Sequence, residues 1–123
     1  MILVDTSVWI DHLRSAESDL SMLLGAGNVL IHPMILGELA CGNLPDRTQT
    51  LRSMMALPVI GELSHERVVS GIESRELSGR GIGFIDAHLI CSVLECQGAL
   101  LWTRDKRLKR VAEDLGVVFS ERQ

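Results

Sequence analysis

The sequence predicts an α/β protein, a three-layer α/β/α sandwich with a mostly parallel central sheet. The first observation behind this prediction is that short aliphatic runs alternate along the chain with longer segments of helical periodicity. That alternation is typical of repeated βαβ units, whose helices cover both faces of a sheet. The second is the length of 123 residues, which supports one hydrophobic core and leaves no room for two domains. We therefore expect residues 1–123 to form a single domain.

The first half of the chain is expected to hold two strands and three helices. Residues 1–4 form an aliphatic run that is typical of a buried strand. A helix follows over 6–14, because its first residues offer N-cap hydroxyls. A short helix over 19–26 is ended by glycines, and a second strand is expected over 28–31. A proline at the first position favours the next helix, over 33–41.

The middle of the chain is predicted to be mainly helical. We expect a helix over 46–57 and a short strand over 58–60, where the helical pattern ends at a proline. Another helix runs over 64–77 and stops at a glycine-rich loop over 79–83. The most apolar helix is expected over 84–97, with a glycine beyond its end.

The last part repeats the strand–helix–strand order, with a strand over 99–102, a helix over 106–115 and a strand over 117–119. In open parallel sheets, ligand sites lie outside the carboxyl ends of the strands. The sequence therefore directs attention to the residues just after Val4, Ile31 and Trp102.

Composition excludes several classes of protein. No apolar run approaches the roughly 20 residues that a membrane helix needs, and the N-terminus lacks the basic region of a signal peptide. The three cysteines have no metal-binding spacing and are interpreted as reduced thiols, so a cytoplasmic location is expected. With 12 basic and 16 acidic side chains the net charge is −4, which by itself argues against nucleic-acid binding.

Four acidic residues attract attention because their surroundings are apolar. The stretches in which one acid is the only charged side chain are 1–10 (Asp5), 20–45 (Glu38) and 81–94 (Asp86). Asp105 follows the predicted strand over 99–102 after a two-residue step. On a helix, Glu38 would have apolar neighbours one turn away on either side and would face an apolar surface.

Isolated carboxylates are seldom buried unless they are paired or bound to a metal ion. The three stretches contain no Lys or Arg to neutralise these acids. If the acids converge, they repel one another, and a hard divalent cation with a preference for oxygen ligands removes that repulsion. The sequence therefore indicates a Mg²⁺ or Mn²⁺ site.

Three of the acids also have plainer interpretations. Asp5 suits a helix cap, and Asp86 suits the positive end of a helix dipole. Asp105 lies in a highly charged stretch and suits a solvated surface. Glu38 fits such an interpretation least, because a mid-helix carboxylate on an apolar face needs a partner.

The residues around the four acids resemble PIN-domain nucleases, and most closely the VapC-type toxins of toxin–antitoxin pairs. The resemblance covers essentially the whole chain, including the order of elements and the spacing of the acids. It rests on these motifs: Asp5-Thr6-Ser7, Ile35-Leu36-Gly37-Glu38-Leu39, Ile85-Asp86-Ala87-His88-Leu89 and Thr103-Arg104-Asp105.

The resemblance implies a metal-dependent endoribonuclease whose pocket is formed by Asp5, Glu38, Asp86 and Asp105. It implies that Mg²⁺ or Mn²⁺ binds these acids and that the hydroxyls of Thr6 and Thr103 support them. It also implies a homodimer that acts on RNA and is inhibited by a small antitoxin, whose tail covers the pocket. No further acid closely follows Asp105, which leaves open whether one metal ion or two are bound.

A window of basic residues beside the fourth acid is a candidate for contacts with the RNA backbone. Arg104, Lys106, Arg107 and Arg110 lie there, and Arg80 in the glycine-rich loop is a weaker candidate. A solvated helix face is the alternative interpretation of this window.

Other interpretations of the chain remain. A PIN-like module that binds or scaffolds RNA without cutting it is the main alternative. Phosphoacceptor domains and haloacid-type phosphatases are disfavoured, since Asp5 has neither an adjacent acid nor a second Asp two residues on. We expect His88 to point away from the acids, whereas His32 either lines the pocket or serves as a cap or surface group.

Overall fold

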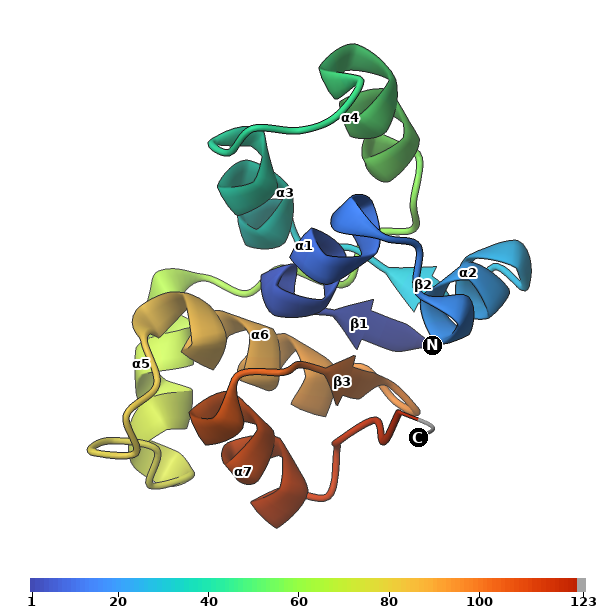
Figure 1. The fold of residues 1–123 in the computed structure, drawn as a ribbon. Coiled ribbons are helices and arrows are strands. Elements are labelled where there is room, and N and C mark those ends of the chain that lie inside the picture. The colour runs from blue at the N-terminus through green and yellow to red at the C-terminus, as the bar shows by residue number, and fades with distance from the viewer. Residues whose placement is uncertain (122–123) are drawn as a thin grey trace.

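The computed structural model describes residues 1–121, and its centre is a three-stranded parallel sheet of order β2-β1-β3 (Figure 1). The middle strand β1 (Ile2–Val4) pairs with β2 (Val29–Leu30) on one side and with β3 (Leu100–Trp102) on the other. All three residues of β1 are buried, as expected for a strand covered on both faces. The predicted α/β class is confirmed.

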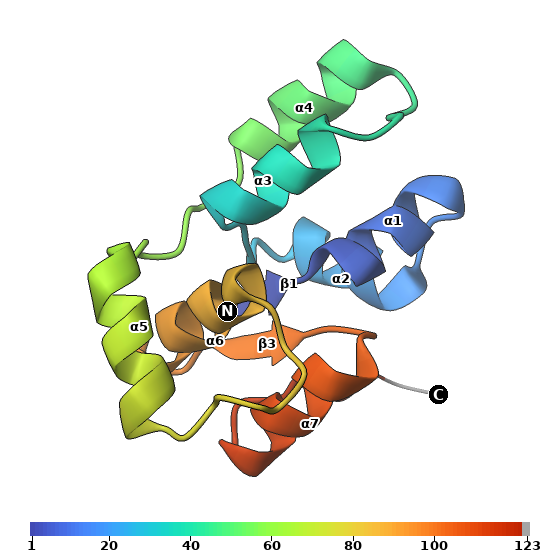
Figure 2. The same ribbon diagram turned by 90° about the vertical axis from the view of Figure 1, so that its left-hand side faces the viewer.

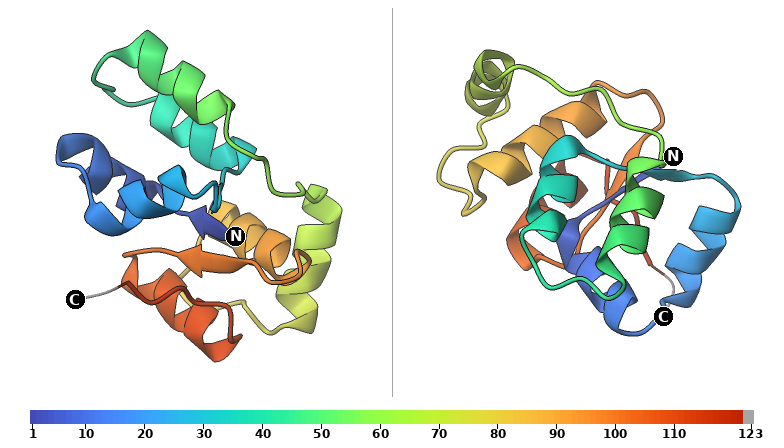
Figure 3. Two further views of the ribbon diagram at one scale, coloured as in Figure 1. Left: turned by 90° about the vertical axis from the view of Figure 1, so that its right-hand side faces the viewer. Right: turned by 90° about the horizontal axis from the view of Figure 1, so that it is seen from above.

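Helices cover both faces of this sheet. Seen along the sheet, α1 and α2 lie on one face and α6 and α7 on the other, with α5 packed against α6, while the α3–α4 hairpin extends past β2 (Figures 2 and 3). The three-layer order predicted from the sequence is therefore present. The helices are α1 (Thr6–Arg14), α2 (Ser18–Gly25), α3 (Pro33–Ala40), α4 (Arg47–Met55), α5 (His65–Ser74), α6 (Phe84–Leu94) and α7 (Lys106–Asp114).

The two further strands predicted over 58–60 and 117–119 are shorter than expected. Each consists of a single parallel bridge at an edge of the sheet, Ile31 with Val59 and Leu101 with Val118. At the first edge the Ile31 N–H donates to Pro58 O and the Ile60 N–H to Ile31 O, and no longer ladder forms. The chain therefore runs beside the sheet at both edges without extending it by a full strand.

The main core lies between the sheet and the helices, where Leu3, Leu89 and Leu101 have no exposed surface. A smaller apolar cluster joins α5 to α6. There a Cβ at Gly71 would lie 2.9 Å from Cys91 Sγ, so only glycine permits this close approach of the two helices. Within the described residues, no helix is long and apolar enough to cross a membrane.

Two histidines lie inside the protein. His32 is fully buried, and its Nδ1 accepts a hydrogen bond from the Met34 N–H at 3.0 Å, which caps α3. Of the roles expected for His32, the cap is the one the structure shows, but it is an interior cap. His88 is also fully buried, and its Nε2 lies 2.7 Å from His65 Nδ1. Burial lowers the pKa of both His32 and His88.

These lowered pKa values predict acid sensitivity of the fold. Above the usual value of 6.5 the folded and unfolded chains both carry a neutral His32. Below it the unfolded chain takes up a proton that the folded chain resists, so stability falls as pH decreases. We expect His32→Asn, which keeps a cap acceptor but does not titrate, to lose less stability than the unmodified chain between pH 7.5 and 5.5. Urea unfolding at both pH values measures this difference, and equal losses would contradict it.

Candidate active site

The four acids predicted from the sequence come from four different elements and lie near the carboxyl ends of the central strands. Asp5 directly follows β1, and Asp105 follows β3 after two residues. Asp86 lies in the first turn of α6, and Glu38 lies on α3. This is the edge of a parallel sheet at which ligand sites form.

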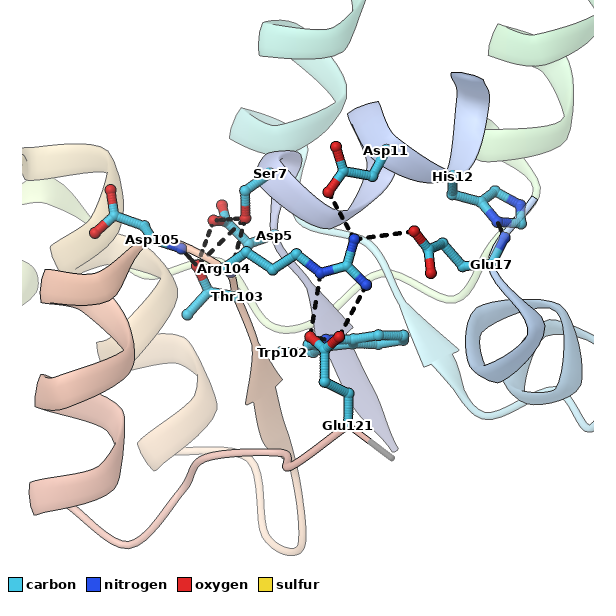
Figure 4. A network of polar contacts seen from close by, with 10 residues as sticks. All are labelled: Asp5, Ser7, Asp11, His12, Glu17, Trp102, Thr103, Arg104, Asp105 and Glu121. Atoms are coloured by element: carbon cyan, nitrogen blue, oxygen red, sulfur yellow. Dashed lines mark hydrogen bonds and ion pairs between the residues drawn. The ribbon is translucent and has the colours of Figure 1, made fainter. Parts of the chain in front are cut away.

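Asp5 is a buried carboxylate held by hydroxyl groups. Its side chain is 7% exposed, and its Oδ2 accepts hydrogen bonds from Thr103 Oγ1 at 2.7 Å and Ser7 Oγ at 2.9 Å (Figure 4). Although Asp5 occupies the N-cap position of α1, its side chain makes no cap hydrogen bond. The plainer interpretation of Asp5 as a helix cap is therefore wrong. The two hydroxyls hold it between β1 and β3.

Ser7 is a site residue that the sequence interpretation treated only as an N-cap. Its Oγ donates to Asp5, lies 3.4 Å from Thr103 Oγ1 and accepts the backbone N–H of Arg104 at 3.0 Å. Thr103 Oγ1 in turn accepts the backbone N–H of Asp105 at 3.1 Å. Ser7 and Thr103 therefore connect the loop after β3 to the acid after β1. The only sign of this role in the sequence is that Ser7 stands two residues after Asp5. Its contacts with Thr103 and Arg104 could not be seen there, because these residues are 96 and 97 positions away.

Glu38 pairs with the other predicted hydroxyl residue. Thr6 Oγ1 donates to Glu38 Oε1 at 2.8 Å, which brings α1 and α3 together. The side chain of Glu38 is exposed, and it borders an apolar surface, as expected from the sequence. It lines a groove of about 320 Å³ between α1 and the α3–α4 hairpin. The apolar part of that groove is lined by Ile10, Leu13, Leu39, Leu44 and Pro45.

Asp86 and Asp105 both serve as helix caps. Asp86 Oδ2 accepts the Gly83 N–H at 3.2 Å, and Asp105 Oδ1 accepts the N–H groups of Arg107 and Leu108, each at 3.0 Å. Each cap uses one carboxylate oxygen. The second oxygen of each has no hydrogen bond from any residue between 1 and 121, so capping and a role in the pocket are compatible.

The electrostatics show that the other three acids act on Asp86. The pKa of Asp86 is raised, first by burial and then by the negative charges of Asp5, Asp105 and Glu38, against the opposing hydrogen bond from Gly83. Among the described residues, none of these four acids forms an ion pair with Lys, Arg or His. The pocket therefore carries negative charge that no side chain in the described part of the chain neutralises.

The donor set suits a hard divalent cation, because every candidate ligand is an oxygen. Over residues 1–121, no three His, Cys, Asp or Glu side chains are close enough together to chelate an ion by themselves. Hydrogen bonds to hydroxyls and to backbone N–H groups instead hold the acids, and the charges of Asp5, Glu38 and Asp105 are near enough to Asp86 to raise its pKa. That arrangement fits Mg²⁺ or Mn²⁺ better than a tightly enclosed metal, because Mg²⁺ commonly keeps several of its waters.

The predicted RNA-contacting residues fall into two groups. Arg104 faces Asp11, Glu17 and Glu121, while Arg80 and Arg110 both pair with Asp114. The remaining two have no ion pair within the described part of the chain and are exposed at the start of α7. They are Lys106 and Arg107.

The glycine-rich loop lies against one of these two residues. A Cβ at Gly81 would lie 2.7 Å from Arg107 Cδ, which leaves no room for a side chain. Gly81 also has φ +80°, a backbone conformation that favours glycine. The loop that precedes Asp86 and the helix that follows Asp105 therefore meet at Arg107.

Residues 2–114 match the sequence profile of a protein family, the PIN domain. The chain belongs to the PIN-domain family. Ribonuclease VapC32 of Mycobacterium tuberculosis, in strains CDC 1551 / Oshkosh and ATCC 25618 / H37Rv, is 45% identical to this chain over 121 residues. The match covers 98% of each sequence. The resemblance to VapC-type PIN domains that the motifs indicated is thereby confirmed.

A solved PIN-like fold has the same architecture. The crystal structure of PAE2754 from Pyrobaculum aerophilum aligns with a TM-score of 0.61 and covers 93% of this chain and 90% of its own. The two sequences are 20% identical, so this match supports the fold alone.

The repulsion inside this PIN-domain pocket predicts a gain in stability when one charge is removed. Because the pKa of Asp86 is raised, its ionised form costs stability at neutral pH. Asp86→Asn keeps an acceptor for the Gly83 N–H and removes the charge. We expect its unfolding midpoint in EDTA at pH 7.5 to rise by roughly 2–5 °C.

Glu73→Gln is the control, since Glu73 is an exposed acid on α5 with no ion pair in the described residues. Its midpoint should stay within about 1 °C of the unmodified chain. An unchanged or lower midpoint for Asp86→Asn would show that the four acids do not repel one another appreciably.

Proposed function

We propose that this chain is a divalent-metal-dependent endoribonuclease and acts as the toxin of a toxin–antitoxin pair. The observation that carries the proposal is the set of four carboxylates near the carboxyl ends of the strands, three of which act on the fourth, with no neutralising ion pair among the described residues. Similarity to a protein named as a ribonuclease over 98% of the chain supports the choice of RNA as substrate. We treat residues 1–123 as one catalytic domain that works in the cytoplasm.

Phosphodiester hydrolysis needs an activated water and relief of negative charge on the phosphate. A bound Mg²⁺ or Mn²⁺ acidifies a coordinated water and offsets the phosphate charge. Asp5, Glu38 and Asp86 would hold the principal ion directly or through water, and Asp105 would complete the pocket. Ser7 and Thr103 fix the orientation of Asp5, and Thr6 fixes that of Glu38. Cleavage by water would leave a 5′-phosphate and a 3′-hydroxyl.

We propose that Lys106 and Arg107 contact the RNA backbone. Both are exposed at the start of α7, next to Asp105, and neither is paired with an acid within residues 1–121. A helix N-terminus adds partial positive charge in the same place. Arg104, Arg80 and Arg110 are omitted from the proposed contact, because nearby carboxylates already bind their guanidinium groups.

The groove beside Glu38 fits the proposed antitoxin. Its lining combines aliphatic side chains with Thr6 and Glu38, which suits an apolar segment of a partner protein that also reaches the acids. Exposed apolar side chains support a homodimer. Met55 and Val59 are 67% and 60% exposed, whereas neighbouring Met54 is in the core.

A non-catalytic RNA-binding or scaffolding module is the second candidate. A module of that kind has no use for three acids that raise the pKa of a fourth, Asp86, and these acids would weaken its RNA binding. The cleavage experiment that follows separates the two functions directly.

Removal of the metal or of Asp5 should stop cleavage. We expect EDTA to reduce cleavage of structured RNA at least about a hundredfold and added Mn²⁺ or Mg²⁺ to restore it. Asp5→Asn should be equally inactive while its circular dichroism spectrum stays unchanged, because the amide can still accept from Ser7 and Thr103. Full activity of either sample would exclude the proposed mechanism.

Charge reversal of Lys106 and Arg107 should weaken RNA binding in a salt-dependent manner. Each lost phosphate contact lowers the slope of log Kd against log salt by about 0.7 for a single strand. We expect Lys106→Glu with Arg107→Glu to raise the Kd and flatten the slope by roughly one to two units. Arg52→Glu, on exposed α4, is the matched control and should leave the slope unchanged. A double variant with the original slope would place the RNA elsewhere.

A further inference from the structure

Arg104 is the most heavily paired cation among the described residues. Its Nη1 lies 2.6 Å from Asp11 Oδ2 and 3.0 Å from Glu17 Oε1, and its Nη2 and Nε lie 3.0 and 3.1 Å from the two carboxylate oxygens of Glu121. These acids come from α1, from the loop before α2 and from the C-terminal segment (Figure 4). One guanidinium therefore joins three segments that are distant in sequence.

The side chain of Arg104 points away from the acid pocket, while its backbone takes part in it. In Figure 4 the guanidinium reaches toward Glu17 and Glu121, on the opposite side from Asp105. The Arg104 N–H donates to Ser7 Oγ, which itself donates to Asp5. Arg104 also lies between the site residues Thr103 and Asp105, so its anchoring sets the path of the loop that carries both.

The C-terminal segment completes this anchor. Glu121 binds Arg104 through both oxygens, a bidentate geometry that defines orientation as well as distance. Its Oε2 also accepts from Trp102 Nε1 at 2.7 Å, so Glu121 is tied to the last residue of β3. The ring of Phe119 packs against that of Trp102, with the ring centroids 4.9 Å apart, and this contact keeps the C-terminal segment beside β3.

We propose that Arg104 is a positioning residue for RNA cleavage, and that Glu121 of the C-terminal segment holds it in place. This inference rests on the proposed ribonuclease function. The guanidinium anchors the Thr103–Asp105 loop from outside the pocket. The loop then places Thr103, and through Ser7 it places Asp5, relative to Asp105. No contact of Arg104 with RNA is required.

Glu121→Gln separates this role from a general effect of charge. Glutamine can still accept from the Trp102 indole, so the variant is expected to fold. Removal of a negative charge should favour RNA binding if electrostatics alone matter. A positioning role instead predicts a kcat about tenfold lower with an unchanged KM, since small displacements of reacting groups are costly. The substrate is a labelled RNA stem–loop that the unmodified chain cuts.

Glu113→Gln is the matched control, because Glu113 is an exposed acid on α7 without an ion pair in the described residues. It makes the same charge change and should leave kcat unchanged. Arg104→Lys keeps the charge but cannot form the two-pronged contact, so it should lower kcat in the same way as Glu121→Gln. The Kd for RNA, measured in EDTA, should stay within about twofold for both variants.

The indole N–H signals in NMR spectra of the metal-free chain give a readout that does not depend on activity. The Trp102 indole donates to Glu121, while the Trp9 indole has no partner among the described residues and serves as an internal reference. Glu121→Gln should change the chemical shifts of the Trp102 indole N–H and the Arg104 amide N–H, and leave that of the Trp9 indole N–H unchanged.

The outcomes are distinct. An unmodified chain that cuts no RNA contradicts the proposed function, and the positioning role falls with it. If the unmodified chain cuts and Glu121→Gln cuts with the same kcat, the positioning role alone is wrong. A lower kcat shared by Glu121→Gln and Arg104→Lys, with an unchanged Kd and the expected NMR shifts, supports it. A raised Kd for Arg104→Lys would instead make Arg104 an RNA contact.

Discussion

Asp5 places a negative charge inside the protein between β1 and β3, and its hydrogen-bond partners are two hydroxyls rather than a cation. Burial of an unpaired carboxylate costs free energy unless hydrogen bonds or a metal ion offset that cost. The rest of the site is arranged around this charge. Ser7 and Thr103 satisfy one oxygen, and the loop after β3 has to keep Thr103 within reach. The three other acids add to the charge instead of cancelling it.

The charge pattern of the surface follows from the same constraint. An arginine beside Asp5 would neutralise the pocket and compete with a metal ion. Arg104, which stands between Thr103 and Asp105 in the sequence, is turned away from the pocket and held by Asp11, Glu17 and Glu121. The net charge of −4 therefore combines the four acids, an outward-facing ion-pair cluster and the exposed cations Lys106 and Arg107 at the start of α7. Net charge alone is a poor guide to the ligand of such a protein, because these regions have different partners.

Much of the fold and the identity of the acids could be predicted from the sequence, because both depend on local patterns. Alternating apolar runs predict the sheet, and an acid isolated in an apolar stretch stands out whatever its tertiary contacts. The contacts of Ser7 and Arg104 could not be predicted in this way, since their partners lie far along the chain. The same holds for Glu38. Helical periodicity predicts its apolar neighbours, and it does line an apolar groove, but its hydrogen bond from Thr6 on α1 depends on how α1 and α3 pack.

Asp105 couples the chemistry of the pocket to the surface proposed to hold RNA. Its Oδ1 caps α7 through the N–H groups of Arg107 and Leu108, while its charge acts on Asp86 across the pocket. The same cap orients the first turn of α7, from which Lys106 and Arg107 project. Any movement of the loop after β3 would therefore shift an acid and two cations together. A PIN domain built in this way keeps the two cations proposed to bind phosphate in register with the acids, because Asp105 contacts the start of α7 and acts on Asp86.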